Sequence, residues 1–127
     1  DFVTIEGTVI KNEEITIPGP APLSYAYCSD TKYFKRLSTF VQGVDLLYHE
    51  ATFESCMGSM ANTTGHSTTS DAARIASDAG VGTLIIGHFS ARYKDVNPLV
   101  NEAREIFPRT FPAIDGHTYE VGLINDP

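Results

Sequence analysis

The sequence predicts an α/β domain, because apolar, strand-like segments alternate along it with segments of helical periodicity. Three of the apolar segments, SYAYCSD, DLLYHE and TLIIGHF, run into Asp30, Glu50 and His88, each of which can bind a metal or move a proton. The carboxyl ends of parallel strands meet at one rim of an open sheet, so residues far apart in sequence become neighbours there. We therefore expect these three side chains to lie in one crevice.

Length and composition are those of an ordinary globular domain. The 127 residues, 42% hydrophobic and 20% charged, suffice for one compact domain or a large piece of one. No segment approaches the ~20 apolar residues that cross a bilayer, which excludes a membrane span. The chain begins at Asp1, and the residues after it lack the basic and apolar regions of a secretion signal. We therefore expect it to be cut from a longer protein.

Cysteine content and charge bear on the compartment and the partners. Cys28 and Cys56 are the only cysteines and form no CxxC pair, which favours a reducing compartment and a cytoplasmic location. The 9 basic and 16 acidic residues give a formal net charge of −7. By itself that charge argues against a nucleic-acid partner, because phosphate contacts need Lys and Arg.

The first part of the chain is predicted to be rich in strands. Residues 3–9 and 14–17 alternate well enough for two strands around the turn-prone KNEE. PGPAP then breaks the pattern before a third strand over residues 23–28. The following run, KYFKRLSTFVQG, places apolar residues on one helical face and ends at Gly43, so a helix is expected over residues 32–43.

The middle of the chain contains the clearest helix. It is preceded by a strand over residues 44–49 and by residues 51–65, which are small and polar without a clear period and are predicted to be a loop. Ser67 or Thr68 can cap the helix, and Gly80 closes it. Its apolar residues recur at i, i+3, i+4 and i+7, which indicates one buried face.

The last part is predicted to continue the alternation. A short β-branched strand covers residues 83–87, and Asn97-Pro98 opens a helix that stops before the next proline. Residues 111–114 and 118–121 are expected to form the final strands. The order β-β-β-α-β-α-β-α-β-β, with no internal repeat, is typical of an α/β fold with short connections.

Asp30 and His88 are the candidate metal ligands. Asp30 lies just past a strand in CSDT, where a carboxylate can bind a divalent ion or bridge two of them. Taken alone, capping of the next helix is the simpler explanation for this aspartate. His88 ends a strand in IIGHFS, where a neutral imidazole points into the rim crevice and suits zinc. A purely structural histidine is the alternative.

His66 and Glu50 are the candidates for proton transfer. His66 in TGHST directly precedes a helix N-terminus, where anionic phosphate is favoured, so it could protonate a leaving group. A simple turn with a capping hydroxyl explains GHST equally well. Glu50 could orient His66 or share its proton. Because strand side chains alternate, His49 is expected to point to the opposite face and to serve packing.

The run FSARYK after His88 supplies candidate phosphate contacts in Ser90, Arg92 and Lys94. A guanidinium beside a metal site fits a phosphate, although an exposed loop charge is the simpler explanation. His117 has no obvious partner, and we assign it no role. The sequence contains no GxGxxG, P-loop, CxxC or GxSxG motif.

Five segments together resemble ribonuclease Z, the family of tRNA 3′-processing endonucleases in the metallo-β-lactamase superfamily. They are CSDT, DLLYHEATF, GHSTTSDAARIASDAG, LIIGHFSARY and FPAIDGHTYEV. The resemblance covers nearly the whole chain from Leu23 onward, in the family's order and spacing. It implies that residues 1–127 form a single domain, the C-terminal half of an αββα sandwich with a mixed sheet covered by helices.

The resemblance also implies roles for individual residues. Asp30 matches the aspartate that bridges two zinc ions, and His88 matches the histidine that completes the second zinc site. Glu50 and His66 match the carboxylate and histidine proposed to deliver a proton as a pair. The implied cofactor is therefore zinc, with two ions in the complete protein.

The implied reaction is hydrolysis of a phosphodiester in precursor tRNA, just after the discriminator nucleotide, which leaves a 3′-hydroxyl. Arg92, with Ser90, falls where the family handles phosphate near the cut. The HxHxDH motif and a further histidine, which supply most of the zinc ligands, are not in this sequence. Because a catalytic zinc usually needs three protein ligands, we expect the isolated chain to be inactive. The family's basic tRNA-gripping arm is also outside it, so the acidity of the chain need not exclude RNA.

Two other functions are considered. A hydrolase or phosphodiesterase of the metallo-β-lactamase fold could act on a small substrate, since this core supports several activities. A half-domain could also serve as a non-catalytic partner or dimerisation module, and the family resemblance implies a homodimer for the complete protein. An isolated half sheet would expose apolar faces, so self-association or poor solubility is expected.

Overall fold

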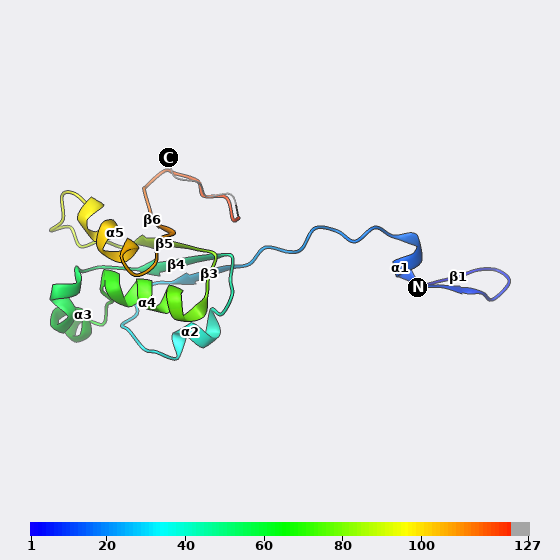
Figure 1. Cartoon of the computed structure of the whole chain (residues 1–127), viewed down its shortest axis with the longest axis horizontal. Helices are drawn as coiled ribbons and strands as arrows, with labels where there is room; N and C mark the ends of the chain where they lie inside the picture. Colours follow the sequence, from blue (N-terminus) through cyan, green and yellow to red (C-terminus); the bar gives the residue numbers. More distant parts are fainter. Residues whose placement is uncertain (123–127) are drawn as a thin grey trace.

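The computed structural model describes residues 1–122, and its centre is a four-stranded parallel sheet (Figure 1). The strands follow chain order across the sheet. They are β3 (Tyr25–Cys28), β4 (Leu46–Glu50), β5 (Thr83–Gly87) and β6 (Thr110–Pro112). The two central strands, β4 and β5, are paired over their whole length, from Leu46 opposite Thr83 to Glu50 opposite Gly87. All four carboxyl ends therefore lie at one rim.

Helices return the chain between the strands, as a parallel sheet requires. The helices that make these connections are α2 (Leu37–Phe40), α4 (Thr69–Ala79) and α5 (Asn97–Arg104). The central helix, α4, packs against both α2 and α5. Its ends agree with the sequence prediction, because Thr68 accepts a hydrogen bond from the backbone N–H of Asp71 and Gly80 adopts the left-handed conformation at φ 61°.

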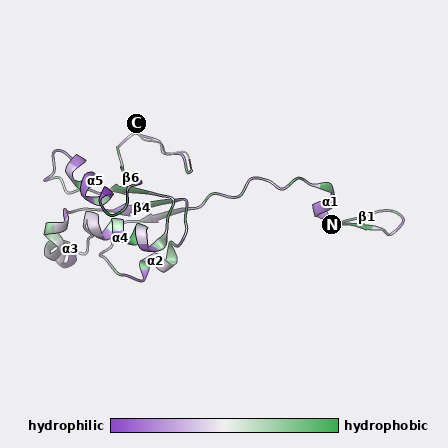
Figure 2. Ribbon diagram, viewed as in Figure 1, coloured by the Kyte–Doolittle hydropathy of each residue, from purple (hydrophilic) through white to green (hydrophobic). Residues whose placement is uncertain are grey.

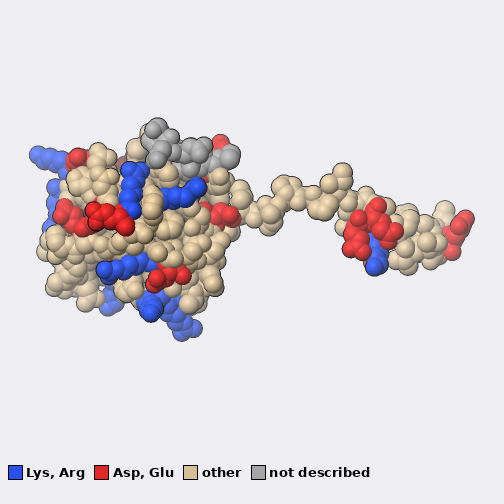
Figure 3. Space-filling model, in the orientation of Figure 1, with Lys and Arg blue, Asp and Glu red and all other residues tan. Residues whose placement is uncertain are grey.

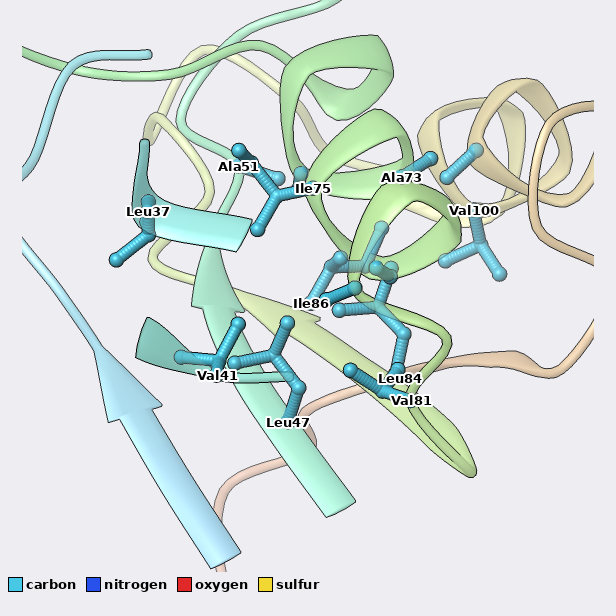
Figure 4. Close-up of a cluster of buried hydrophobic side chains, with 14 residues drawn as sticks. Leu37, Val41, Leu47, Ala51, Ala73, Ile75, Val81, Leu84, Ile86 and Val100 are labelled. Carbon is cyan, nitrogen blue, oxygen red and sulfur yellow. The ribbon is translucent and has the colours of Figure 1, made fainter. Parts of the chain in front are cut away.

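The core lies between the sheet and this helical layer (Figure 4). Leu47, Leu84 and Ile86 of β4 and β5 belong to one cluster with Ile75 of α4, and all four side chains are fully buried. Val100, which belongs to α5, extends the cluster to that helix. In Figure 2 the hydrophobic colouring of the sheet includes β5, whose sequence is TLIIG. Burial of these apolar side chains is the main stabilising term, at roughly 1.5–3 kcal/mol for each large one.

No helix of residues 1–122 covers the other face of the sheet. Tyr25 and Tyr27 lie there with 54% and 63% of their surface exposed, and the ring of Tyr27 stacks on that of Tyr48 with centroids 4.5 Å apart. The segment after β6 runs along part of this face, where it lines a pocket with Tyr25, Tyr48 and Ile85. The described strands of this sheet are thus parallel rather than mixed, and one face is left largely open.

The N-terminal prediction was wrong in detail. In place of strands over residues 3–9 and 14–17, the chain forms a hairpin of two strands, each two residues long, and one helical turn. These elements are β1 (Phe2–Val3), β2 (Val9–Ile10) and α1 (Asn12–Ile15). A turn interrupts the first expected strand, because the N–H of Gly7, at φ 82°, donates to the carbonyl of Thr4. The second gives way to helix because the carboxylate of Glu14 accepts from the N–H of Lys11. An extended segment joins these elements to the body (Figure 1).

The predicted loop over residues 51–65 contains two helical elements. They are the 3-10 helix η1 (Ser55–Met57) and the helix α3 (Gly58–Thr64). The segment has no apolar period because Ala61 is the one residue of α3 that is buried. Gly65, at φ 81°, ends α3 and directs the chain to His66.

Other boundaries moved for local reasons. The helix expected over residues 32–43 is limited to α2. Just before it the N–H of Leu37 donates to the carbonyl of Phe34 and the N–H of Ser38 donates to that of Lys35, three residues back, as in a turn. The strand expected over residues 118–121 does not form. There the hydroxyl of Tyr119 donates to the carbonyl of Pro112 and fixes a turn.

Cavity creation tests this packing. We expect Leu47→Ala, at a site with 0% exposure, to lower the free energy of unfolding in urea by about 2–5 kcal/mol. The matched control Ile17→Ala, at a site with 94% exposure, should change it by less than about 0.5 kcal/mol. Equal effects of the two substitutions would contradict the core as described.

Candidate functional site

The candidate site lies at the rim where the strands of the parallel sheet end. Asp30 follows β3, Glu50 is the last residue of β4, and His88 follows β5, as the sequence predicted. The Nε2 atom of His88 lies 3.5 Å from Oδ1 of Asp30. The Nδ1 atom of His66 lies 2.9 Å from Oε1 of Glu50. The structure therefore brings together the four residues predicted for metal binding and proton transfer.

The Glu50 carboxylate is the centre of this arrangement. Its side chain is 0% exposed, yet each oxygen accepts two hydrogen bonds. Oε1 accepts from the N–H of Thr31 at 2.8 Å and from Nδ1 of His66 at 2.9 Å. Oε2 accepts from the hydroxyl of Thr52 at 2.7 Å and from the N–H of Ser67 at 3.2 Å. Four donors satisfy the charge that burial would otherwise destabilise.

The pKa of Glu50 reflects this balance. Burial alone raises the pKa of the carboxyl group, but the bonds from Thr52, His66, Ser67 and Thr31 outweigh burial and lower the pKa below 4.5. Glu50 is therefore an anion at neutral pH. As an anion it only accepts hydrogen bonds, so the Nδ1 atom of His66 carries the proton of their shared bond.

Backbone pairing holds the segment with His66 beside β4. The N–H of Phe53 donates to the carbonyl of Ser67 at 3.4 Å, and the N–H of Thr69 donates to the carbonyl of Phe53 at 2.9 Å. His66 thus stands directly before the N-terminus of α4, where the helix dipole favours negative charge. The ionised Glu50 carboxylate, bonded to the N–H of Ser67, occupies that position.

The backbone is unusual at the two predicted metal ligands. Asp30 has φ 49° and His88 has φ 60°, and within residues 1–122 they are the only non-glycine residues with positive φ. Such conformations are uncommon for residues with side chains and concentrate at functional sites. At both positions the chain leaves a strand end, and the turn directs the side chain over the rim.

Asp30, His66 and His88 form a group that can hold a metal ion. Each offers one ligand atom, and the three atoms lie within 4.8 Å of one another. A carboxylate oxygen with two imidazole nitrogens is a donor set that suits a divalent transition metal. His66, which the sequence analysis assigned to proton transfer, is thus also within reach of an ion held by Asp30 and His88.

The predicted phosphate contacts lie at the edge of the site. Nε of Arg92 donates to the hydroxyl of Ser90 at 3.2 Å, and the guanidinium lies 5.1 Å from the ring centre of Phe53. Phe53 in turn meets His66 edge to face, with ring centres 6.3 Å apart. Arg92 is therefore exposed and separated from His66 by the ring of Phe53. Lys94 is also exposed.

The two remaining histidines lie away from the rim. His49 is fully buried on the helical side of β4, as the alternation predicted, and its Nδ1 atom lies 2.6 Å from the carbonyl of Glu50. Burial lowers the pKa of His49 from its ordinary value of 6.5. His117 is exposed and lines the pocket on the opposite face of the sheet.

Sequence reasoning missed Thr31, Thr52 and Ser67. Thr31 and Ser67 contribute backbone N–H groups, which no residue type reveals. Thr52 contributes its hydroxyl, and its position two residues after Glu50 was the available signal, because alternate residues of an extended segment share a side.

Comparison with known proteins relates the chain to ribonuclease Z. A ribonuclease Z of Parabacteroides distasonis is 53% identical over 116 residues, which are 91% of this chain and 38% of the relative. A ribonuclease Z of Bacteroides fragilis is 50% identical over 113 residues, 89% of this chain and 37% of the relative. The chain thus spans 37% to 38% of the length of these curated relatives. No family model matches the chain.

Solved structures show the same relationship at the level of the fold. The metallo-β-lactamase fold protein YhfI of Bacillus subtilis superposes with a TM-score of 0.68 at 28% identity, over 74% of this chain and 38% of YhfI. Human tRNase Z, short form, superposes with a TM-score of 0.52 at 27% identity, over 66% of this chain and 27% of the human protein. The predicted α/β class and metallo-β-lactamase fold are confirmed. Among residues 1–122, no helix has both the length and the hydrophobicity needed to span a membrane.

Removing the charge of Glu50 tests the centre of the site. In Glu50→Gln one carboxylate oxygen is replaced by an NH₂ group. This group is a donor, and it faces the two donors that the oxygen accepted from. We expect the free energy of unfolding to fall by about 3 kcal/mol. The matched control Glu105→Gln, at an exposed position, should change it by less than about 0.5 kcal/mol. A similar small effect at Glu50 would show that its four bonds contribute little.

The free energy of unfolding should decrease in two steps as the pH is lowered. The folded-state pKa of His49 is lowered from 6.5, so the unfolded chain binds the proton first and stability falls as pH drops below 6.5. The folded-state pKa of Glu50 is lowered from 4.5, so a further loss begins below that pH. Urea unfolding across this range measures both losses, and His49→Gln should reduce the first one. An undiminished first loss in that variant would contradict the assignment to His49.

Proposed function

Because the chain is homologous to part of ribonuclease Z, we propose that it forms one part of the active site of a metal-dependent endoribonuclease. The reaction is phosphodiester hydrolysis that removes the 3′ trailer from precursor tRNA and leaves a 3′-hydroxyl. The observation that supports this most strongly is the convergence of Asp30, His66 and His88 above the buried Glu50 carboxylate. Purely structural packing does not require such a set at one sheet rim.

Asp30 and His88 are proposed as the metal ligands of this part. The exposed fractions of their side chains are 74% and 43%, so both are open to an ion and to further ligands from outside the chain. We propose zinc, two ions in the complete protein, because carboxylate oxygen and imidazole nitrogen suit this metal. An ion held there would supply Lewis-acid chemistry, namely activation of water and neutralisation of charge on the phosphate. Two ligands hold zinc weakly, and the isolated chain is expected to be inactive.

His66 is proposed as the group that protonates the departing 3′ oxygen. Its Nδ1–H bond to Glu50 fixes the ring orientation and leaves Nε2 to hold the transferred proton. The Glu50 anion stabilises the imidazolium that carries this proton, so histidine and carboxylate act as a pair. The pair lies partly buried, since the His66 side chain is 24% exposed, which strengthens the electrostatic coupling.

Arg92, with Ser90, is proposed to contact substrate phosphate. The guanidinium keeps donors free for a phosphate at the edge of the site nearest His66. Over the face shown in Figure 3, basic and acidic side chains are interspersed, so this face is no uniform basic surface. We propose that this part of the protein contributes catalysis and local phosphate contacts. A cytoplasmic location and a homodimer belong to the same proposal.

A hydrolase of a small phosphodiester is the second candidate. It is considered because the chain also superposes on the metallo-β-lactamase fold protein YhfI, and one fold can support several activities. Cleavage of bis(p-nitrophenyl) phosphate without cleavage of precursor tRNA would select this candidate. Absence of both activities in the full-length protein would leave the non-catalytic partner module.

Histidine substitutions in the full-length protein test the proposal. With a precursor tRNA that carries a 3′ trailer, His66→Ala should lower the rate of cleavage by about 100- to 10,000-fold, because the general acid is lost. His117→Ala is the matched control and should leave the rate unchanged, since His117 lies on the opposite face of the sheet. Full activity of His66→Ala would overturn the proposed proton donor.

A further inference from the structure

Thr52 connects the two halves of the candidate site. Its hydroxyl oxygen lies 2.7 Å from Oε2 of Glu50 and 2.9 Å from Nδ1 of His88. The residue is 6% exposed, so water has little access to compete for these bonds. Through Thr52, the carboxylate that orients His66 is hydrogen-bonded to the ring of a proposed metal ligand.

The proton positions in this chain of bonds follow from the number of donors. A hydroxyl has one proton, and the Glu50 carboxylate can only accept. The Thr52 proton is therefore directed to Oε2, and the Thr52 oxygen accepts from Nδ1–H of His88. This leaves the Nε2 lone pair of His88 free on the side of the ring that faces Oδ1 of Asp30, 3.5 Å away.

Backbone bonds fix Thr52 relative to His88. The N–H of Ala51 donates to the carbonyl of Gly87 at 2.8 Å, and the N–H of Ser90 donates to the carbonyl of Thr52 at 3.0 Å. These bonds tie the segment after β4 to the residues on either side of His88. A β-branched threonine also has few accessible rotamers. The hydroxyl is therefore held in place before any ligand binds.

We propose that Thr52 is a positioning residue that selects the Nδ1–H tautomer of His88 and so presents Nε2 as its metal-binding atom. The same hydroxyl occupies Oε2 of Glu50 and leaves Oε1 to orient His66. One side chain thereby sets the geometry of both the metal ligand and the proton-transfer pair. The tautomer selection depends on geometry alone, whereas its use in metal binding rests on the proposed function.

Three variants separate this role from simple packing. Thr52→Val keeps the shape of the side chain but removes the hydroxyl, whereas Thr52→Ser keeps the hydroxyl. Thr63→Val is the matched control, because Thr63 is exposed on α3 and its hydroxyl bonds the carbonyl of Ser59 within the same helix. The readout is the long-range ¹H–¹⁵N correlation spectrum of the histidine rings in metal-free protein at neutral pH, which distinguishes the two tautomers.

The proposal predicts the Nδ1–H tautomer of His88 in the wild type, Thr52→Ser and Thr63→Val, and a shift toward the Nε2–H tautomer in Thr52→Val. Zn²⁺ titration of the full-length protein against a competing chelator should show affinity about 10- to 100-fold weaker in Thr52→Val, the usual effect of losing a bond to a ligating histidine. Thr52→Ser should restore it.

Two results would overturn the proposal. The first is an Nε2–H tautomer of His88 in the wild type, a measurement that does not require any variant to fold. The second is an unchanged tautomer and unchanged Zn²⁺ affinity in Thr52→Val. Failure of the full-length protein to cleave precursor tRNA would instead refute the proposed function, and the tautomer result would stand apart from it.

Discussion

A buried anion determines how this site is built. Glu50 ends the central strand β4 with a side chain that water does not reach, and an ionised carboxylate in such a place is stable only when its oxygens are fully hydrogen-bonded. The four donors come from Thr31, Thr52, His66 and Ser67. Thr31 lies in the segment after β3, and Thr52 lies in the segment after β4. His66 and Ser67 lie in the segment before α4. The charge requirement of one residue thus fixes the segments that carry Asp30 and His66.

The parallel sheet supplies the second condition for the site. Register between β4 and β5 places Glu50 beside Gly87, so the next residue, His88, emerges at the same rim. An ideal Cβ at Gly87 would lie 2.7 Å from the hydroxyl of Tyr48, and a larger residue there would displace either Tyr48 or the strand end. A glycine at position 87 therefore lets Tyr48 pack against the end of β5 without displacing His88, the next residue.

Sequence alone predicted the parts of the structure in which local signals and global packing agree. The helix α4 was predicted within two residues at its start, because capping residues, apolar period and terminal glycine all indicate it. The convergence of Asp30, Glu50 and His88 followed from the topology of parallel strands. The helices at residues 55–64 were missed because they are mostly exposed and have no apolar stripe. Thr31 was missed because it acts through its backbone, and Thr52 because its hydroxyl is defined only by its two neighbours.

The central claim is that Glu50 is an anion stabilised by its four donors. It is tested most directly by following the ¹³C shift of the Glu50 carboxyl carbon as pH is lowered. The structure predicts a midpoint below the ordinary value of 4.5, because hydrogen bonding outweighs burial. A midpoint above 4.5 would show that burial dominates. Glu50 could then be protonated more readily than an exposed glutamate, and the account of how it orients His66 and Thr52 would be wrong.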